Sequence, residues 1–125
     1  MYSYEINEAE NLVSVFVSGP VDLPSSRQLL AAVTGDARFN PTLNFLVDVR
    51  DMTASPSMSD LRQFADFLGQ AKALGRFGVV AAPGVQYGMG RMIATLAGLR
   101  DIRMGVFRDE ASARAWLRTI VGDEQ

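Results

Sequence analysis

The chain has 125 residues, of which 48% are hydrophobic and 21% charged, which predicts one globular domain over 1–125. Its net charge of -2 provides no basic field, so nucleic acid is not an expected partner. Cysteine and histidine are both absent, which excludes thiolate catalysis, the commonest general base and the commonest metal ligand. We expect no metal and no cofactor. The sequence shows no signal peptide and no apolar run of the ~20 residues that a membrane span needs, which predicts a cytoplasmic protein.

Strands and helices are predicted in alternation along the chain. Two strands over 2–6 and 12–18 flank a short polar turn and should form an antiparallel hairpin. A helix capped by Ser25 or Ser26 follows, ending near Val33. The remaining predicted elements are a strand over 43–48, a helix over 59–74, a strand over 77–82, a helix over 86–99, a strand over 102–107 and a last helix capped by Asp109.

This order predicts an α/β domain with a single-layer, mixed, mainly parallel sheet of five strands and about four helices. The N-terminal antiparallel hairpin should place strand 2–6 at an edge of the sheet. A homodimer is a further expectation, because an exposed edge strand needs protection.

Three stretches of the chain resemble SpoIIAA-like proteins. They are the strand that contains Asp48, the Tyr-Gly-Met-Gly-Arg-Met segment over 87–92, and the ending Val-Phe-Arg-Asp over 106–109 with Ala-Arg-Ala-Trp-Leu over 113–117. The resemblance covers nearly the whole chain. It implies the STAS fold, which sulfate transporters share with anti-sigma-factor antagonists.

The resemblance also implies a non-enzymatic domain that binds a protein partner or a small apolar or anionic ligand. The best-understood relatives are switched by phosphorylation of a serine at the start of the helix after the third strand, in an Asp-Ser-Ser-Gly motif. That motif is absent here, and the matching region is 53–61. Ser57 is nearest to the switch position by its spacing from Asp48, so it is the candidate phosphorylation site. A helix N-cap is the alternative role for Ser57 or Ser59.

The candidate binding residues come from loops at the carboxyl ends of the predicted strands, where open α/β sheets bind their ligands. They are Arg50, Asp51, Tyr87, Gly88 and Arg91. A helix start attracts anions, and Arg91 could add a bidentate contact to a carboxylate or phosphate. The alternative is that the glycines of 87–91 allow a tight turn or close helix packing, with Arg91 paired to Asp48 or Asp51.

Four carboxylates also belong to the predicted strand ends: Asp22, Asp48, Asp51 and Asp109. Together they could bind a hard cation such as magnesium or transfer protons. Neighbouring arginines favour the simpler interpretation, in which these side chains form ion pairs and helix caps.

Methionine and aromatic residues support a second hypothesis, a carrier with an apolar pocket near the same loops. The residues proposed to line it are Met52, Met58, Phe64, Phe67, Tyr87, Met89 and Met92. Ordinary core packing is the alternative for them. A third hypothesis, an enzyme working with carboxylates, Tyr87 and arginines, has no nucleophile–base pair to support it.

Overall fold

The computed structural model describes residues 1–20, 22–53, 57–70 and 75–118 of the chain. Within them, nine elements alternate as the sequence predicts. The strands are β1 (Tyr2–Asn7), β2 (Leu12–Gly19), β3 (Asn44–Met52), β4 (Phe77–Val80) and β5 (Met104–Phe107). The helices are α1 (Leu23–Thr34), α2 (Met58–Gln70), α3 (Val85–Gly98) and α4 (Glu110–Leu117).

The five strands form one mixed sheet in the order β1-β2-β3-β4-β5. β1 pairs with β2 in the antiparallel direction, and the other three pairs are parallel. The predicted fold class, the N-terminal hairpin and the edge position of strand β1 are therefore confirmed. The hairpin turn includes Asn11 with a φ of 54°, a left-handed conformation that asparagine tolerates better than most residues.

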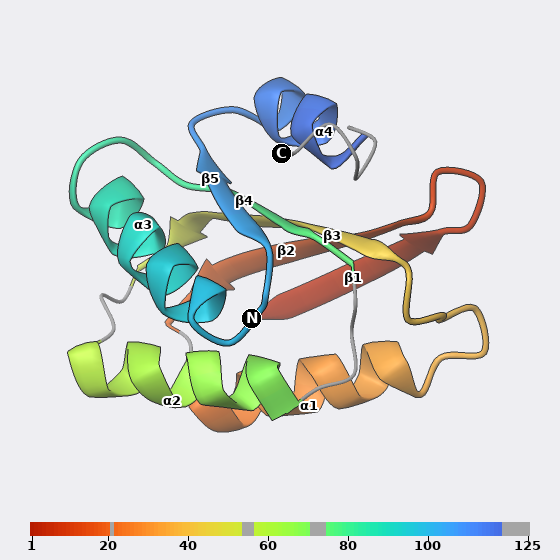
Figure 1. The fold of residues 1–125 in the computed structure, drawn as a ribbon, viewed down its shortest axis with the longest axis horizontal. Coiled ribbons are helices and arrows are strands. Elements are labelled where there is room, and N and C mark those ends of the chain that lie inside the picture. Colours follow the sequence, from red (N-terminus) through yellow and green to blue (C-terminus); the bar gives the residue numbers. More distant parts are fainter. Residues whose placement is uncertain (21, 54–56, 71–74, 119–125) are drawn as a thin grey trace.

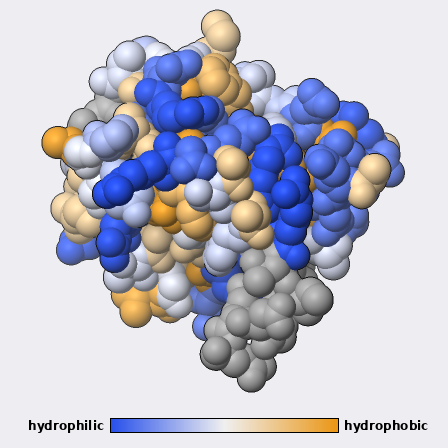
Figure 2. All heavy atoms as spheres, turned by 90° about the horizontal axis from the view of Figure 1, so that it is seen from above, coloured by the Kyte–Doolittle hydropathy of each residue, from blue (hydrophilic) through white to orange (hydrophobic). Residues whose placement is uncertain are grey.

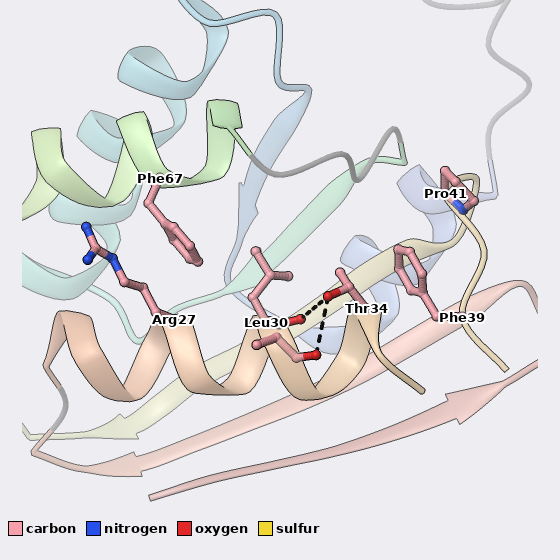
Figure 3. A pocket seen from close by; sticks show the side chains of 7 residues that line it. Arg27, Leu30, Thr34, Phe39, Pro41 and Phe67 are labelled. Atoms are coloured by element: carbon pink, nitrogen blue, oxygen red, sulfur yellow. Dashed lines mark hydrogen bonds between the residues drawn. The ribbon is translucent and has the colours of Figure 1, made fainter. Parts of the chain in front are cut away.

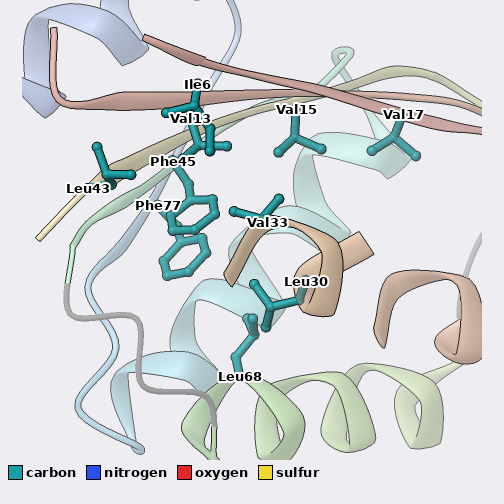
Figure 4. Packing of buried hydrophobic residues seen from close by; sticks show 10 residues of the cluster. All are labelled: Ile6, Val13, Val15, Val17, Leu30, Val33, Leu43, Phe45, Leu68 and Phe77. Atoms are coloured by element: carbon teal, nitrogen blue, oxygen red, sulfur yellow. The ribbon is translucent and has the colours of Figure 1, made fainter. Parts of the chain in front are cut away.

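Helices cover both faces of the sheet, but unequally. In Figure 1, α1 and α2 lie on one side of the strands and α4 lies on the other. The main core fills the space between the sheet, α1 and α2, and Figure 4 shows its ten buried residues: Ile6, Val13, Val15, Val17, Leu30, Val33, Leu43, Phe45, Leu68 and Phe77. A further cluster joins α2 to α3 through Leu61, Ala65 and Ile93.

The opposite face of the sheet is covered by α4 over β3, β4 and β5. A small apolar cluster that includes Leu46 and Val80 packs against Ala113 and Leu117 of α4. Phe16 of β2 belongs to the same face of the sheet and is 43% exposed. Figure 2 looks onto this side of the molecule, where hydrophilic side chains dominate and apolar atoms form scattered patches.

Some element ends differ from the prediction. Strand β3 continues from Asp48 to Met52, because β2 continues to pair with it beyond a register shift, as far as Gly19 opposite Met52. The N-cap of α1 is Asp22 rather than Ser25 or Ser26, since its carboxylate accepts the Ser25 N–H at 2.8 Å. The predicted last turn of the helix over 59–74 falls on 71–74, outside the described residues.

Strand β4 ends at Val80, two residues earlier than predicted, and strand β5 begins at Met104, two residues later. The two strands pair only over these four positions. Among the described residues, none of the helices has the length and apolar character required to cross a membrane.

Candidate functional site

The candidate binding residues lie at the edge of the sheet where the parallel strands end. Helices α2, α3 and α4 begin at the same edge, because each follows directly on one of these strands. Arg50 and Asp51 belong to the end of β3, while Tyr87 and Gly88 belong to the first turn of α3. Arg91 lies one helical turn further along α3.

Arg50 forms a bidentate ion pair with Asp48 on strand β3. Its Nε and Nη2 atoms donate to the two carboxylate oxygens at 3.0 and 2.8 Å. The hydrogen bonds from Arg50 lower the pKa of Asp48. The two side chains meet because residues two apart on a strand point to the same face. The alternative in which Arg91 pairs with Asp48 or Asp51 is not seen among the described residues, where Asp48 pairs with Arg50 instead.

Two other carboxylates of this region, those of Asp22 and Asp109, act as helix caps. Asp22 accepts the Ser25 N–H at 2.8 Å, and Asp109 accepts the Ser112 N–H at 2.7 Å, as predicted for Asp109. These backbone hydrogen bonds lower the pKa of both aspartates. In the described part of the chain, no three acidic side chains come together in a way that could hold a metal ion.

Tyr87 packs against a second arginine of the sheet edge. The guanidinium carbon of Arg108, which follows β5, lies 4.8 Å from the centroid of the Tyr87 ring, a cation–π geometry. Gly90 allows close packing, since a Cβ there would lie 2.9 Å from a methyl group of Val106. A Cβ at Gly88 would meet nothing within 4 Å, so this position is open on its outer side.

Ser57 is the N-cap of α2 and is exposed. Its Oγ accepts the Asp60 N–H at 3.1 Å, and a carboxylate oxygen of Asp60 accepts the Ser57 N–H at 3.1 Å. This reciprocal arrangement is a capping box. The predicted capping role is confirmed for Ser57, while Ser59 instead accepts a hydrogen bond from Gln63. The neighbouring Ser55 falls outside the described residues.

A groove between α1 and α2 has no counterpart among the sequence predictions. Its volume is about 390 Å³, and it is lined by Arg27, Leu30, Ala31, Thr34, Phe39, Pro41 and Phe67. Figure 3 shows Phe67 reaching from α2 toward α1, with Phe39 and Pro41 at the other end. The guanidinium carbon of Arg27 lies 5.5 Å from the centroid of the Phe67 ring. Sequence reasoning missed the groove because its two walls come from segments far apart in the chain.

The residues proposed to line an apolar pocket near the strand ends have different positions in the structure. Only Phe67 lines the groove, which lies away from those loops. Phe64 and Met89 pack into the contact between α2 and α3, and Met52 packs against the main core. Met58 and Met92 are exposed.

Comparison with known proteins places this geometry in a defined class. A family model described as SpoIIAA-like matches residues 12–118. The chain therefore belongs to the SpoIIAA-like family, as its resemblance implied. A search of curated proteins finds no match.

Two solved structures share the fold. One is an uncharacterized protein of the DUF3478 family with a SpoIIAA-like fold from Shewanella loihica PV-4, with a TM-score of 0.61 and 16% identity over 94% of this chain and 92% of that one. The other is an anti-sigma factor antagonist from Mycobacterium paratuberculosis, with a TM-score of 0.60 and 23% identity over 95% of this chain and 96% of that one.

Proposed function

We propose that this chain is a non-enzymatic regulatory module of the STAS type that binds a protein partner, with Ser57 as its phosphorylation switch. Membership of the SpoIIAA-like family and the fold shared with an anti-sigma factor antagonist support this class of function. The observation that carries the proposal is the exposed capping box of Ser57 and Asp60 at the start of α2.

Phosphorylation of Ser57 would change both the charge and the local geometry of this surface. A phosphate carries a charge of about -1.5 to -2 at neutral pH, and on the Oγ atom it would stand beside the Asp60 carboxylate. The Asp60 carboxylate already lies next to Ser57, because one of its oxygens accepts the Ser57 backbone N–H at 3.1 Å. A phosphate on Ser57 and the Asp60 carboxylate would therefore repel each other. A partner that docks over the start of α2 would meet a different surface in each state.

The Ser57→Asp variant is expected to lose at least roughly tenfold in affinity for the partner, because a fixed charge imitates the phosphate. Aspartate is a good N-cap, so the helix itself should keep its stability. The measurement is mass-spectrometric quantification of proteins that co-purify with each variant from the source cells. Ser3→Asp is the matched control, since it makes the same substitution at an exposed position of β1, away from the start of α2. Equal capture by wild type and Ser57→Asp would refute the switch.

The groove between α1 and α2 favours a second candidate function, the binding of a small organic anion with an apolar body. Its volume of about 390 Å³ falls within the range of small-molecule sites, and its walls are mainly apolar. Arg27 lies at the groove without an ion-pair partner among the described residues, so a carboxylate would find a cation there.

Octanoate is expected to bind this groove more tightly than octanol, and Arg27→Gln should abolish the difference while leaving octanol binding unchanged. Calorimetric titration of both compounds into both proteins measures this, and chemical-shift changes at Leu30 and Phe67 locate the site. Equal affinities of wild type for the acid and the alcohol, or shifts confined to other elements, would count against the groove as an anion site.

A further inference from the structure

Exposed apolar side chains gather on the surface formed by α2 and α3. Six large hydrophobic residues are exposed among those described, and four of them belong to these helices or their ends: Met58, Val85, Met92 and Leu99. Val85 and Leu99 are 73% and 76% exposed. Folded proteins rarely leave such a grouping without a partner. Figure 1 shows the two helices at the same end of the molecule, and the α2–α3 cluster of Leu61, Ala65 and Ile93 joins them.

The spacing of these side chains matches a helical partner. Val85, Met92 and Leu99 follow one another at intervals of seven along α3, which places them on one line of the helix. Gly88 and Thr95, three residues after Val85 and Met92, are exposed on the same side of the helix. We call these five residues the α3 seam. A helix could approach closely at Gly88, where no neighbour lies within 4 Å of a Cβ position.

Two arginines flank the α3 seam. Arg91 lies on α3 itself, and Arg62 lies on α2, one turn before Asp66, on the side of α2 that contacts the end of α3. Neither guanidinium group has an ion pair or hydrogen bond within the described residues. Two carboxylates of α2 near Arg62 already have partners, since Asp66 pairs with Arg100 at 2.6 Å and Asp60 belongs to the capping box. The border of the seam therefore carries two unpaired positive charges, at Arg62 and Arg91, which favour acidic side chains of a partner at these positions.

We propose that the α3 seam, together with Met58, Arg62 and Arg91, binds an acidic amphipathic α-helix of a protein partner. The apolar side of that helix packs along the seam, and its acidic side chains pair with the two arginines. This inference rests on the proposed partner-binding function and names its surface and partner class. It also explains the direction of the switch: Ser57 immediately precedes Met58, so a phosphate there repels an acidic helix.

The experiment uses a synthetic peptide of about three heptads, with leucine at the seam-facing positions and glutamate beside them, and a twin with lysine in place of glutamate. Fluorescence anisotropy, below the concentration at which each peptide self-associates, should show saturable binding of the acidic peptide and at least roughly tenfold weaker binding of the basic one. Met92→Glu should lower the acidic peptide's affinity by a similar factor. Gln28→Glu, an equal charge change at an exposed position of α1, should not.

The double variant Arg62→Glu, Arg91→Glu should reverse the preference between the two peptides. Equal binding of both peptides by wild type, no saturable binding of the acidic one, or chemical-shift changes confined to the α1–α2 groove would overturn the inference. Binding to phosphatidylserine vesicles with the same arginine dependence and no peptide binding would overturn it in favour of a membrane surface.

If Ser57→Asp still weakens capture of the cellular partner while the peptide fails to bind, the seam is wrong and the proposed function stands. If the peptide binds while Ser57→Asp changes neither measurement, the seam is correct and the switch is wrong.

Discussion

Replacing Gly75 with alanine is expected to destabilise the fold by about 3 kcal/mol or more, because the new methyl group would collide with backbone. An ideal Cβ at Gly75 lies 1.9 Å from the carbonyl oxygen of Leu43 and 2.6 Å from its carbon. Neither atom belongs to a flexible side chain, so relief requires the two segments to separate. The hydrogen bond that the Phe45 N–H donates to the Arg76 carbonyl at 2.8 Å would be lost with that separation.

Urea unfolding of the purified variant measures this loss, and a fall of roughly 10 °C in Tm should accompany it. Gly88→Ala is the matched control, because the same change in an open helical position should stabilise the protein by about 0.5–1 kcal/mol. A Gly75→Ala variant as stable as wild type would show that β3 and the start of β4 do not approach as closely as the structure has them.

Replacing Phe77 with alanine is expected to cost about 3–5 kcal/mol, the usual range for removing a large aromatic side chain from a core. Phe77 is 6% exposed and stacks on Phe45, with ring centroids 4.6 Å apart and planes 9° from parallel. The two rings sit side by side on paired strands of the main core (Figure 4). Alanine would leave a cavity and remove the ring contact at once.

Phe16→Ala is the control for this prediction. It makes the same change on another strand of the sheet, where the ring is 43% exposed on the face that α4 leaves open. This substitution should lower the free energy of unfolding by less than about 1 kcal/mol, mainly because alanine has a lower strand propensity than phenylalanine. Chemical denaturation of the three proteins compares the two costs, and similar values for both variants would contradict the assignment of Phe77 to the core.

The candidate site shows how far sequence reasoning reaches. The position of Arg50, Ser57 and Tyr87 near one sheet edge follows from strand order alone, since each helix begins where a parallel strand ends. The contact partner of each side chain could not be predicted from strand order. Asp48 pairs with Arg50 rather than with Arg91, and Tyr87 packs under Arg108, because these contacts depend on side-chain directions at the sheet edge.

The buried Arg76 is another feature that sequence reasoning missed. It is 2% exposed, and one of its guanidinium nitrogens donates to the Trp116 carbonyl at 2.8 Å. Its backbone N–H donates to the side chain of Asn44, which in turn donates to the Leu117 carbonyl. An arginine beside a predicted buried strand could have indicated a buried hydrogen-bonding side chain. Its partners could not be predicted, because they lie more than thirty residues away in the chain.

The sequence by itself determined the order of strands and helices, the N-terminal hairpin at the sheet edge, the cap of Asp109, and a serine cap, Ser57 or Ser59, at the start of α2. These features depend on alternation of apolar residues and on contacts within a few positions along the chain. Only the tertiary structure decided the groove between α1 and α2, the close approach at Gly75, and the seam that α3 presents beside α2. Those features arise where segments distant in the sequence meet, and local periodicity contains no information on which faces will meet or how closely.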